Sequence, residues 1–183
     1  MERDKLLKKI DSFKDELITM RRHIHAHPEL SGLENQTAIL ISGYLKNIGG
    51  RVTESVGKTG VVADFGPKDK GFIGLRVDMD ALPIYTNTNL SFSSKIDGIM
   101  HACGHDGHTT MLLGAAKYLA EKGNFDGTVN FIFQPAEENE GGGKAMIDEG
   151  LFDKYPVESV YGMHNIPGMP VGSFAIKPGP IMA

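Results

Sequence analysis

The spacing of apolar residues along the chain predicts several helices. Apolar side chains recur at helical spacing through residues 3–25, and we expect this helix to end before Pro28, because proline disfavours helix in the residue that precedes it. Residues 35–48 carry a second such pattern, which two glycines close. A third helix is predicted at 107–121, and a short one with a glycine-rich start at 141–150.

Apolar runs of another kind predict strands between these helices. They are short, rich in valine, isoleucine and phenylalanine, and bounded by glycines or charged turns. The runs lie at 52–56, 60–66, 72–80, 127–135, 157–164 and 171–176. Strands that alternate with helices indicate an α/β domain with a mostly parallel sheet.

Ionisable side chains follow three of these predicted strands. Asp78 and Asp80 end the third strand, Glu137 and Glu138 follow the fourth, and His164 ends the fifth. In open α/β sheets, binding sites gather beyond the carboxyl ends of the strands. We therefore expect these residues to converge on one site, together with the histidine-rich stretch between the third and fourth strands.

That stretch, HACGHDGHTT at 101–110, holds three of the seven histidines and the only cysteine of the chain. Thiolate and imidazole are ligands that hold zinc and similar transition ions. Gly104 lets the backbone bend so that Cys103 and His105 can face one ion. Alternatively, Cys103 is a small buried hydrophobic residue and not a ligand.

The remaining histidines carry a weaker signal. His101 and His108 could each be a metal ligand, but each could equally contact substrate, support a ligand or lie on the surface. Asp106 can cap the helix that follows or hold a ligand histidine in its working tautomer. The three histidines of RRHIHAHPEL run off a helix end into proline, which favours a supporting or surface role over a metal site.

The paired acidic residues suggest hydrolytic chemistry. Adjacent residues of an extended segment point to opposite sides, so one of Glu137 and Glu138 can bind a metal while the other reaches a metal-activated water. Such a carboxylate takes the proton of the water and returns it to a leaving amine. Asp78 and Asp80 share one face of a strand, and one of them could orient a ligand histidine. Asp80 also fits a turn made by Asp-Ala-Leu-Pro, and adjacent glutamates are common on solvated surfaces.

Composition narrows the class of protein. The chain has 183 residues and a net charge of −4, and its lysines and arginines are scattered, which argues against a nucleic-acid partner. No run reaches the ~20 apolar residues of a membrane span. A single cysteine cannot form an internal disulfide, and the charged N-terminus lacks the apolar stretch of a signal peptide. These features predict a cytoplasmic, reduced protein.

Six segments taken in order resemble one known family. They are RRHIHAHPEL, LRVDMDALPI, MHACGHDGHTTMLLGAA, GTVNFIFQPAEE, GGGKAMIDEG and MHNIPGMPVG. They are similar to the metal-dependent amidohydrolases that include hippurate hydrolase, indole-3-acetyl-amino acid hydrolase and bacterial N-acyl-amino acid deacylases. These enzymes are related to the zinc carboxypeptidases and aminoacylases, and the resemblance covers nearly the whole chain.

The resemblance implies a role for each of six residues. Cys103, His105, Glu138 and His164 would be ligands of a centre of two divalent metal ions, of zinc or manganese, with cobalt and nickel chemically possible. Glu137 would be the general base and acid. Asp78 would be the second catalytic carboxylate, holding the centre from behind. The implied reaction is hydrolysis of the amide bond of a small-molecule N-acyl amino acid, and the implied fold is a zinc-exopeptidase-like three-layer α/β/α domain with a mostly parallel mixed sheet.

The resemblance also implies an organisation into parts. Members of the family are longer, so residues 1–183 would be the N-terminal part of the catalytic domain, incomplete at the C-terminus. A lid and dimerisation domain, and a C-terminal catalytic segment with a further histidine ligand, would be absent from it. We expect the full-length type to be a homodimer, and this chain alone to have little or no activity.

Other functions remain open at this point. A dipeptidase or an N-acyl-diaminopimelate deacylase would need the same centre. A protein of another class, a non-catalytic metal-binding fragment, would keep the site without the chemistry. The charged N-terminal helix could also bind a partner, although its apolar stripe is more simply explained as facing the core.

Overall fold

The fold is a single mixed sheet with helices on both of its faces. The computed structural model describes residues 2–68, 70–123 and 125–180, and within them five strands and six helices are present. The strands are β1 (Arg51–Val56), β2 (Gly60–Phe65), β3 (Phe72–Asp78), β4 (Thr128–Gln134) and β5 (Ser159–Gly162). The helices are α1 (Glu2–Asp11), α2 (Lys14–Ala26), α3 (Asn35–Asn47), α4 (His105–Lys122), α5 (Gly142–Asp148) and α6 (Leu151–Lys154).

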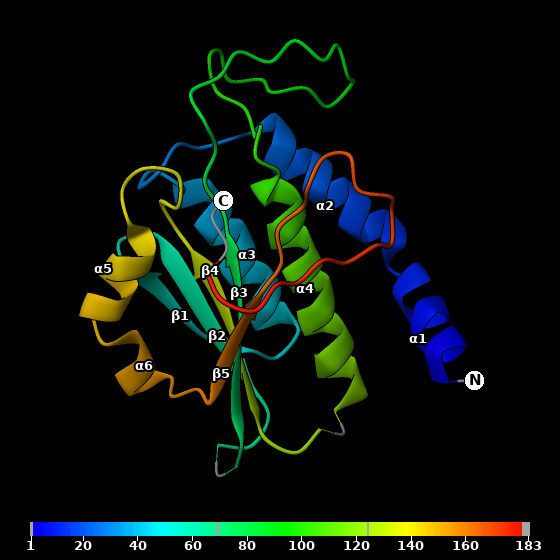
Figure 1. Cartoon of the computed structure of the whole chain (residues 1–183), viewed down its shortest axis with the longest axis vertical. Helices are drawn as coiled ribbons and strands as arrows, with labels where there is room; N and C mark the ends of the chain where they lie inside the picture. The colour runs from blue at the N-terminus through cyan, green and yellow to red at the C-terminus, as the bar shows by residue number, and fades with distance from the viewer. Residues whose placement is uncertain (1, 69, 124, 181–183) are drawn as a thin grey trace.

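The strands follow the order β1-β2-β4-β3-β5 (Figure 1). β4, β3 and β5 run parallel to one another, whereas β1 with β2 and β2 with β4 are antiparallel. The long connection from β3 to β4 contains α4, and the connection from β4 to β5 contains α5 and α6. The candidate residues lie at or after the carboxyl ends of β3, β4 and β5, which are the three parallel strands of the sheet.

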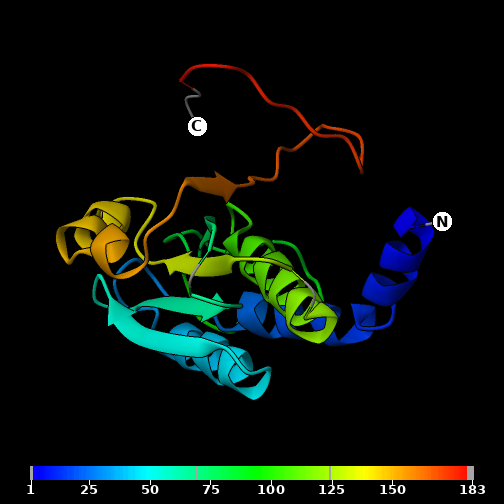
Figure 2. The ribbon, with the colours of Figure 1, turned by 90° about the horizontal axis from the view of Figure 1, so that it is seen from below.

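The side chains of β4 alternate between the two faces of the sheet, so this strand packs against both helix layers. Val129, Phe131 and Phe133 point to the face covered by α3 and α4, and Ile132 points to the face covered by α5 and α6. Phe131 and Phe133 are fully buried, and burying a side chain of this size contributes ~1.5–3 kcal/mol. The two faces give the helix–sheet–helix layering of an α/β domain (Figure 2).

The larger core lies between the sheet and the pair α3 and α4. α2 packs on the outer side of α4, where Leu17 lies against Gly114 so closely that an added Cβ would come within 2.8 Å of its Cδ1. The smaller core joins β2 and β4 to α5 and α6 through Met146 and Leu151. The two cores hold β3 and β4, the strands whose ends carry Asp78 and the Glu137–Glu138 pair.

The predicted α/β fold class is confirmed, and two predicted elements were wrong. The single helix expected at 3–25 is two helices, separated at Ser12 and Phe13. Phe13 is buried, with the ammonium groups of Lys9 and Lys117 near its ring, and the chain changes direction to place it there. The strand expected at 171–176 is absent, because no neighbouring strand pairs with this alternating run.

The apolar stripe of α1 does not face the core. Leu6, Leu7 and Ile10 of α1 are each more than one-third exposed. α1 extends beyond α2 at the edge of the molecule (Figures 1 and 2). The expectation that the stripe of the N-terminal helix faces the core is therefore wrong for α1, but it holds for α2, where Met20 packs against the larger core and Leu17 against α4.

The segment that follows β5 is irregular and exposed. Residues 163–180 cross in front of α4 in Figure 1, but Figure 2 shows most of this segment standing away from the body of the fold. Val171, Phe174 and Ile176 are almost fully exposed. Among the described residues, no helix combines the length and the apolar character needed to cross a bilayer.

Candidate metal centre

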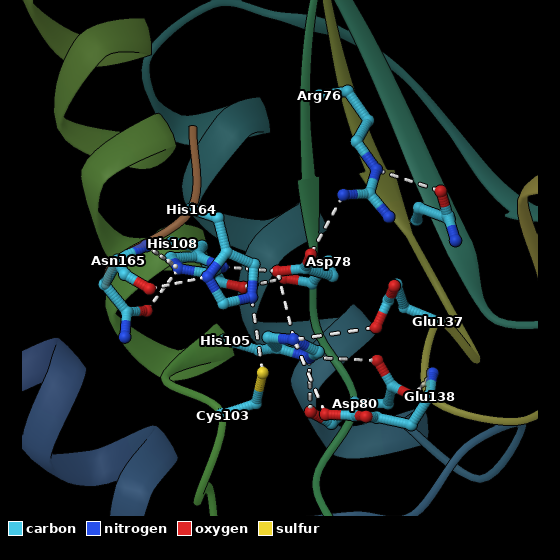
Figure 3. Close-up of polar contacts among 12 residues, drawn as sticks. Arg76, Asp78, Asp80, Cys103, His105, His108, Glu137, Glu138, His164 and Asn165 are labelled. Carbon is cyan, nitrogen blue, oxygen red and sulfur yellow. Dashed lines mark hydrogen bonds and ion pairs between the residues drawn. The ribbon is translucent and has the colours of Figure 1, made fainter. Parts of the chain in front are cut away.

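The candidate residues meet beyond the carboxyl ends of the parallel strands (Figure 3). Asp78 is the last residue of β3, and Glu137 and Glu138 follow β4 after a bend at Pro135 and Ala136. His164 follows β5. His105 begins α4, and Cys103 precedes it in the loop. The structure thus brings together all six residues proposed from the sequence, in three overlapping groups that share His105: Cys103, His105 and His164; Asp78, His105 and His108; His105, Glu137 and Glu138.

The fully buried ring of His105 is held in one tautomer. Its Nδ1 donates to the backbone carbonyl of Asp80 at 2.9 Å and faces Oδ1 of the same residue at 3.1 Å. A carbonyl only accepts, so in the neutral imidazole the proton is on Nδ1 and Nε2 keeps a free lone pair. Burial lowers the pKa of His105, but the Asp80 hydrogen bond and nearby carboxylates outweigh it and raise the pKa overall. The surroundings of this imidazole therefore favour a positive charge at Nε2, whether a proton or a metal ion supplies it.

The free Nε2 of His105 is the strongest indication of a metal ion. It is buried and has no hydrogen-bond partner. Three carboxylate oxygens surround it: Asp78 Oδ1 at 3.7 Å, Glu138 Oε1 at 3.7 Å and Glu137 Oε2 at 3.8 Å. Oε1 of Glu138 is likewise buried without a hydrogen bond. Two ligands of a tetrahedral ion bound at about 2.1 Å lie roughly 3.4 Å apart, so the spacing of these atoms suits a divalent cation.

Cys103 and His164 form the second pair of donors. Sγ of Cys103 lies 3.3 Å from Nε2 of His164, although the two residues are 61 positions apart. Burial, together with the charges of Glu138 and Asp78, raises the pKa of Cys103 to about 12. The thiol is therefore protonated when no cation is near, and a metal that binds it displaces the proton.

Asp78 is held by hydrogen bonds from two neighbouring side chains. Its Oδ1 accepts a hydrogen bond from Nδ1 of His108 at 2.6 Å, and its Oδ2 accepts one from Arg76 at 2.9 Å. Burial pushes the pKa of Asp78 upward, but the His108 hydrogen bond and the charges of His105 and Arg76 bring it below its usual value. The resemblance gives Asp78 the role of the second catalytic carboxylate, which holds the centre from behind, and the carboxylate that faces Nδ1 of His105 is that of Asp80.

Asp80 is the residue that sequence reasoning undervalued. Besides holding His105, it accepts hydrogen bonds on Oδ2 from the backbone N–H of Glu138 at 3.0 Å and from the hydroxyl of Ser31 at 2.7 Å. Burial opposes ionisation, but these contacts lower the pKa of Asp80 to about 2. The only signal in the sequence is its two-residue spacing from Asp78, which also fits a turn.

Two further residues support the centre without a clear signal in the sequence. His108, between Asp78 and the segment after β5, is buried, and its Nε2 faces the backbone N–H of Asn165 at 3.1 Å and its side-chain oxygen at 2.5 Å. Asn165 thereby ties the His164 segment to α4. The ring of His164 also packs on that of His108, with centroids 4.7 Å apart.

The other histidines lie outside the donor groups. His101 is buried, and burial lowers its pKa to about 4, which keeps it neutral near pH 7. Asp106 holds no metal ligand; its Oδ2 accepts hydrogen bonds from Arg21 and from His25. Of the N-terminal histidines, His25 is buried against Asp106 and His23 is exposed.

The fold and these donors place the chain in the class of α/β peptidase domains that carry a metal centre. It belongs to peptidase family M20/M25/M40, whose sequence model matches residues 74–180. The structure superposes on that of the YXEP protein of Bacillus subtilis, a dinuclear metal-binding peptidase of the M20 family, with a TM-score of 0.87 and 44% identity. This match covers 93% of the chain and 48% of that protein. The family resemblance expected from the sequence is confirmed.

Curated relatives point to the same family. The hippurate hydrolase of Campylobacter jejuni is 51% identical over 180 residues, which are 97% of this chain and 46% of the relative. An N-acetylcysteine deacetylase of Bacillus subtilis is 45% identical over 175 residues, which are 94% of this chain and 46% of the relative. The chain therefore spans about half the length of the curated relatives it matches.

Proposed function

We propose that this chain holds the dinuclear metal centre of an amidohydrolase that cleaves the amide bond of N-acyl amino acids. The observation that carries the proposal is the buried, unpartnered Nε2 of His105, with carboxylates of both Glu137 and Glu138 within 3.8 Å. The substrate class is supported by the names of the two relatives, hippurate hydrolase and N-acetylcysteine deacetylase.

In this proposal the metal ions are held by Cys103, His105, Glu138 and His164. When bound, a divalent ion such as zinc or manganese supplies Lewis acidity, which acidifies water and polarises a carbonyl group. Asp80 keeps His105 in the tautomer that leaves Nε2 free.

Glu137 is the proposed general base and acid. Its side chain is 37% exposed, whereas that of Glu138 is 18% exposed, so Glu137 is the one of the pair that solvent and a substrate reach more easily. A carboxylate there can take a proton from the attacking water and deliver it to the leaving amine. Asp78, locked by Arg76 and His108, is the proposed second catalytic carboxylate and adds negative charge beside the donors.

Residues 1–183 are proposed to form the N-terminal part of the catalytic domain. In the full-length type, a lid and dimerisation domain and a C-terminal catalytic segment with a further histidine would complete the site, and the protein would act as a cytoplasmic homodimer. The half-length match to the curated relatives supports this organisation. We therefore expect weak turnover from this chain alone.

The metal content of the purified chain tests the centre. After incubation with zinc or manganese and removal of excess metal, we expect about one or two ions per chain in the wild type and fewer in Cys103→Ala. His23→Ala, which removes an exposed histidine of α2 outside the donor groups, is the matched control and should keep the wild-type content. A folded wild type without metal would contradict the proposal.

Release of free amino acid from hippurate and from N-acetylcysteine tests the reaction. We expect slow release by the metal-loaded wild type and none by Glu137→Gln, which should bind metal as the wild type does. Equal release by the two chains would contradict the role of Glu137.

A further inference from the structure

Glu34 is a buried carboxylate that the proposed chemistry does not use. Its exposed fraction is 0%, and a buried charge is costly unless hydrogen bonds compensate it. Its oxygens accept three: Oε1 from the backbone N–H of Gly32 at 2.9 Å and of Ala136 at 2.8 Å, and Oε2 from the hydroxyl of Thr59. One side chain thus joins its own loop, the turn between β1 and β2, and the bend after β4.

The bend that Glu34 holds is the one that directs the glutamate pair. Ala136 has a φ of +49°, in the left-handed region that residues other than glycine seldom adopt. It lies directly before Glu137 and Glu138, so its conformation sets the direction in which both leave β4. The carbonyl of Ala136 accepts a hydrogen bond from the N–H of Gly142 at 3.0 Å. The corner is therefore fixed on both sides, with Glu34 holding its N–H.

The loop that carries Glu34 supports the pair at a second point. Ser31 donates to Oδ2 of Asp80, the same oxygen that accepts from the N–H of Glu138. The backbone amides on either side of Glu137 are therefore each held by a buried carboxylate, Glu34 on one side and Asp80 on the other.

Capping of α3 does not explain Glu34. It is the residue before the first turn of α3, but its side chain makes no capping hydrogen bond. The amides of Gln36 and Thr37 are held instead by the carboxylate of Glu29. The carboxylate of Glu34 is thus directed away from its own helix and toward Ala136.

We propose that Glu34 is a positioning residue for the Glu137–Glu138 pair, because it fixes the Ala136 corner and thereby the approach of both carboxylates to Nε2 of His105. The roles of Glu137 and Glu138 at a metal centre rest on the proposed function. The contact between Glu34 and Ala136 is independent of that function, because it needs no metal.

Three variants and one control separate positioning from stability. Glu34→Ala removes the contact, and Glu34→Asp keeps the charge but is one methylene too short to reach Ala136. Glu34→Gln should rescue, because its amide oxygen can accept from both backbone N–H groups while its NH₂ donates to the hydroxyl of Thr59. Glu29→Ala is the matched control: it removes a carboxylate with three hydrogen bonds from the same loop, none of them to the Ala136 corner.

Cobalt(II) titration measures the consequence at the centre. The thiolate-to-cobalt absorption band of Cys103, the only cysteine of the chain, reports binding. Loss of a residue that orients ligands typically weakens metal binding about 10–100-fold, and we expect this in Glu34→Ala and Glu34→Asp. Glu34→Gln and Glu29→Ala should bind as the wild type does. Wild-type affinity in Glu34→Ala, or in Glu34→Asp if the alanine variant does not fold, overturns the proposal.

Hydrogen exchange of the Ala136 amide in the metal-free protein measures the contact itself. We expect faster exchange in Glu34→Ala and Glu34→Asp, and wild-type exchange in Glu34→Gln and Glu29→Ala. If the wild type shows no cysteine-dependent cobalt band, the proposed function fails, and Glu34 is then judged on exchange alone. An Ala136 amide that exchanges at the wild-type rate in Glu34→Ala and Glu34→Asp overturns the positioning role in either case.

Discussion

At the scale of single residues, Asp80 joins the two halves of the candidate centre. One of its oxygens faces Nδ1 of His105, and the other accepts from the N–H of Glu138 and from Ser31. A change that moves Asp80 therefore disturbs the histidine and the glutamate pair together. These contacts explain how the carboxylate of Asp80, which is not itself a proposed metal ligand, can be buried and ionised.

Gly104 tests whether the loop between Cys103 and His105 requires a backbone conformation that only glycine adopts easily. Its φ is +100°, and an added Cβ would lie 2.4 Å from Oδ1 of Asn165. Gly104→Ala should cost about 1–2 kcal/mol of unfolding free energy through the backbone alone, and should also weaken cobalt binding because Asn165 must move. Chemical denaturation and cobalt titration measure the two effects.

Gly107→Ala is the control for that substitution. Gly107 lies in α4, and an added Cβ would meet nothing within 4 Å. Replacing a helical glycine by alanine should stabilise the chain by roughly 0.5–1 kcal/mol and leave cobalt binding unchanged. Similar losses from both substitutions would show that the loop has no special conformational requirement.

Local sequence signals predict the donors better than the residues that hold them. Cys103 and His105 stand in one short motif, so their chemistry is visible without a structure. Apart from Gly32, the partners of Asp80 and Glu34 lie 25 to 102 positions away and include backbone amides, which have no signature in the sequence. Their roles follow from strand order and helix packing, which the apolar pattern does not specify.

At the scale of elements, one polar cluster ties together three helices. Glu16 of α2 accepts hydrogen bonds from Tyr44 of α3 at 2.9 Å and from Lys117 of α4 at 2.5 Å. The Lys117 hydrogen bond lowers the pKa of Glu16 although burial opposes it. The junction fixes how α2 and α3 lie against the helix that begins with His105.

Glu16→Gln should weaken this junction in a pH-dependent way. The pKa of Glu16 is lower in the folded state, so its ionised form contributes stability that is present above its ordinary pKa and is lost as the pH falls through the lowered value. The side chain is 41% exposed, which limits the expected loss near pH 7 to about 1 kcal/mol or less. Thermal unfolding between pH 3 and pH 7 measures it.

Asp15→Asn removes a neighbouring charge from the same first turn of α2 and serves as the control. It shares the interaction with the helix dipole but is not part of the three-helix junction. A loss in Glu16→Gln that equals the loss in Asp15→Asn, or that persists unchanged at low pH, would contradict the role of the junction.

Periodicity predicts those elements whose stripes face the core. α3 lies within a residue of its predicted bounds and α4 within two, because both press an apolar face on the sheet. The break between α1 and α2 accompanies the burial of Phe13 beside Lys117 of a distant helix, and the run at 171–176 has strand-like alternation without a strand to pair with. Such outcomes depend on tertiary contacts that a local pattern does not contain.

At the scale of the whole molecule, metal binding should be coupled to stability. A ligand that binds only the folded state at 100 times its dissociation constant adds about 2.7 kcal/mol. We expect added zinc to raise the unfolding temperature of the wild type and a chelator to reverse the effect. Cys103→Ala should respond much less. An equal response in both chains would place the effect outside the candidate centre.

The exposed segment after β5 provides a second readout of the same coupling. His164 and Asn165 connect residues 163–180 to the rest of the fold through Cys103 and His108. Limited proteolysis should therefore cut this segment more slowly in the zinc-loaded chain than in the chelator-treated one. Equal rates would indicate that His164 is not engaged by the ion.

The position of β4 between β2 and β3 has a consequence for synthesis of the chain on the ribosome. β2 and β3 follow one another along the chain but do not pair, so the nascent sheet keeps a gap until residues 128–134 have emerged. Cys103 and His105 emerge before that strand, and His164 after it. The four proposed donors are therefore all present only after the segment that follows β5 has emerged.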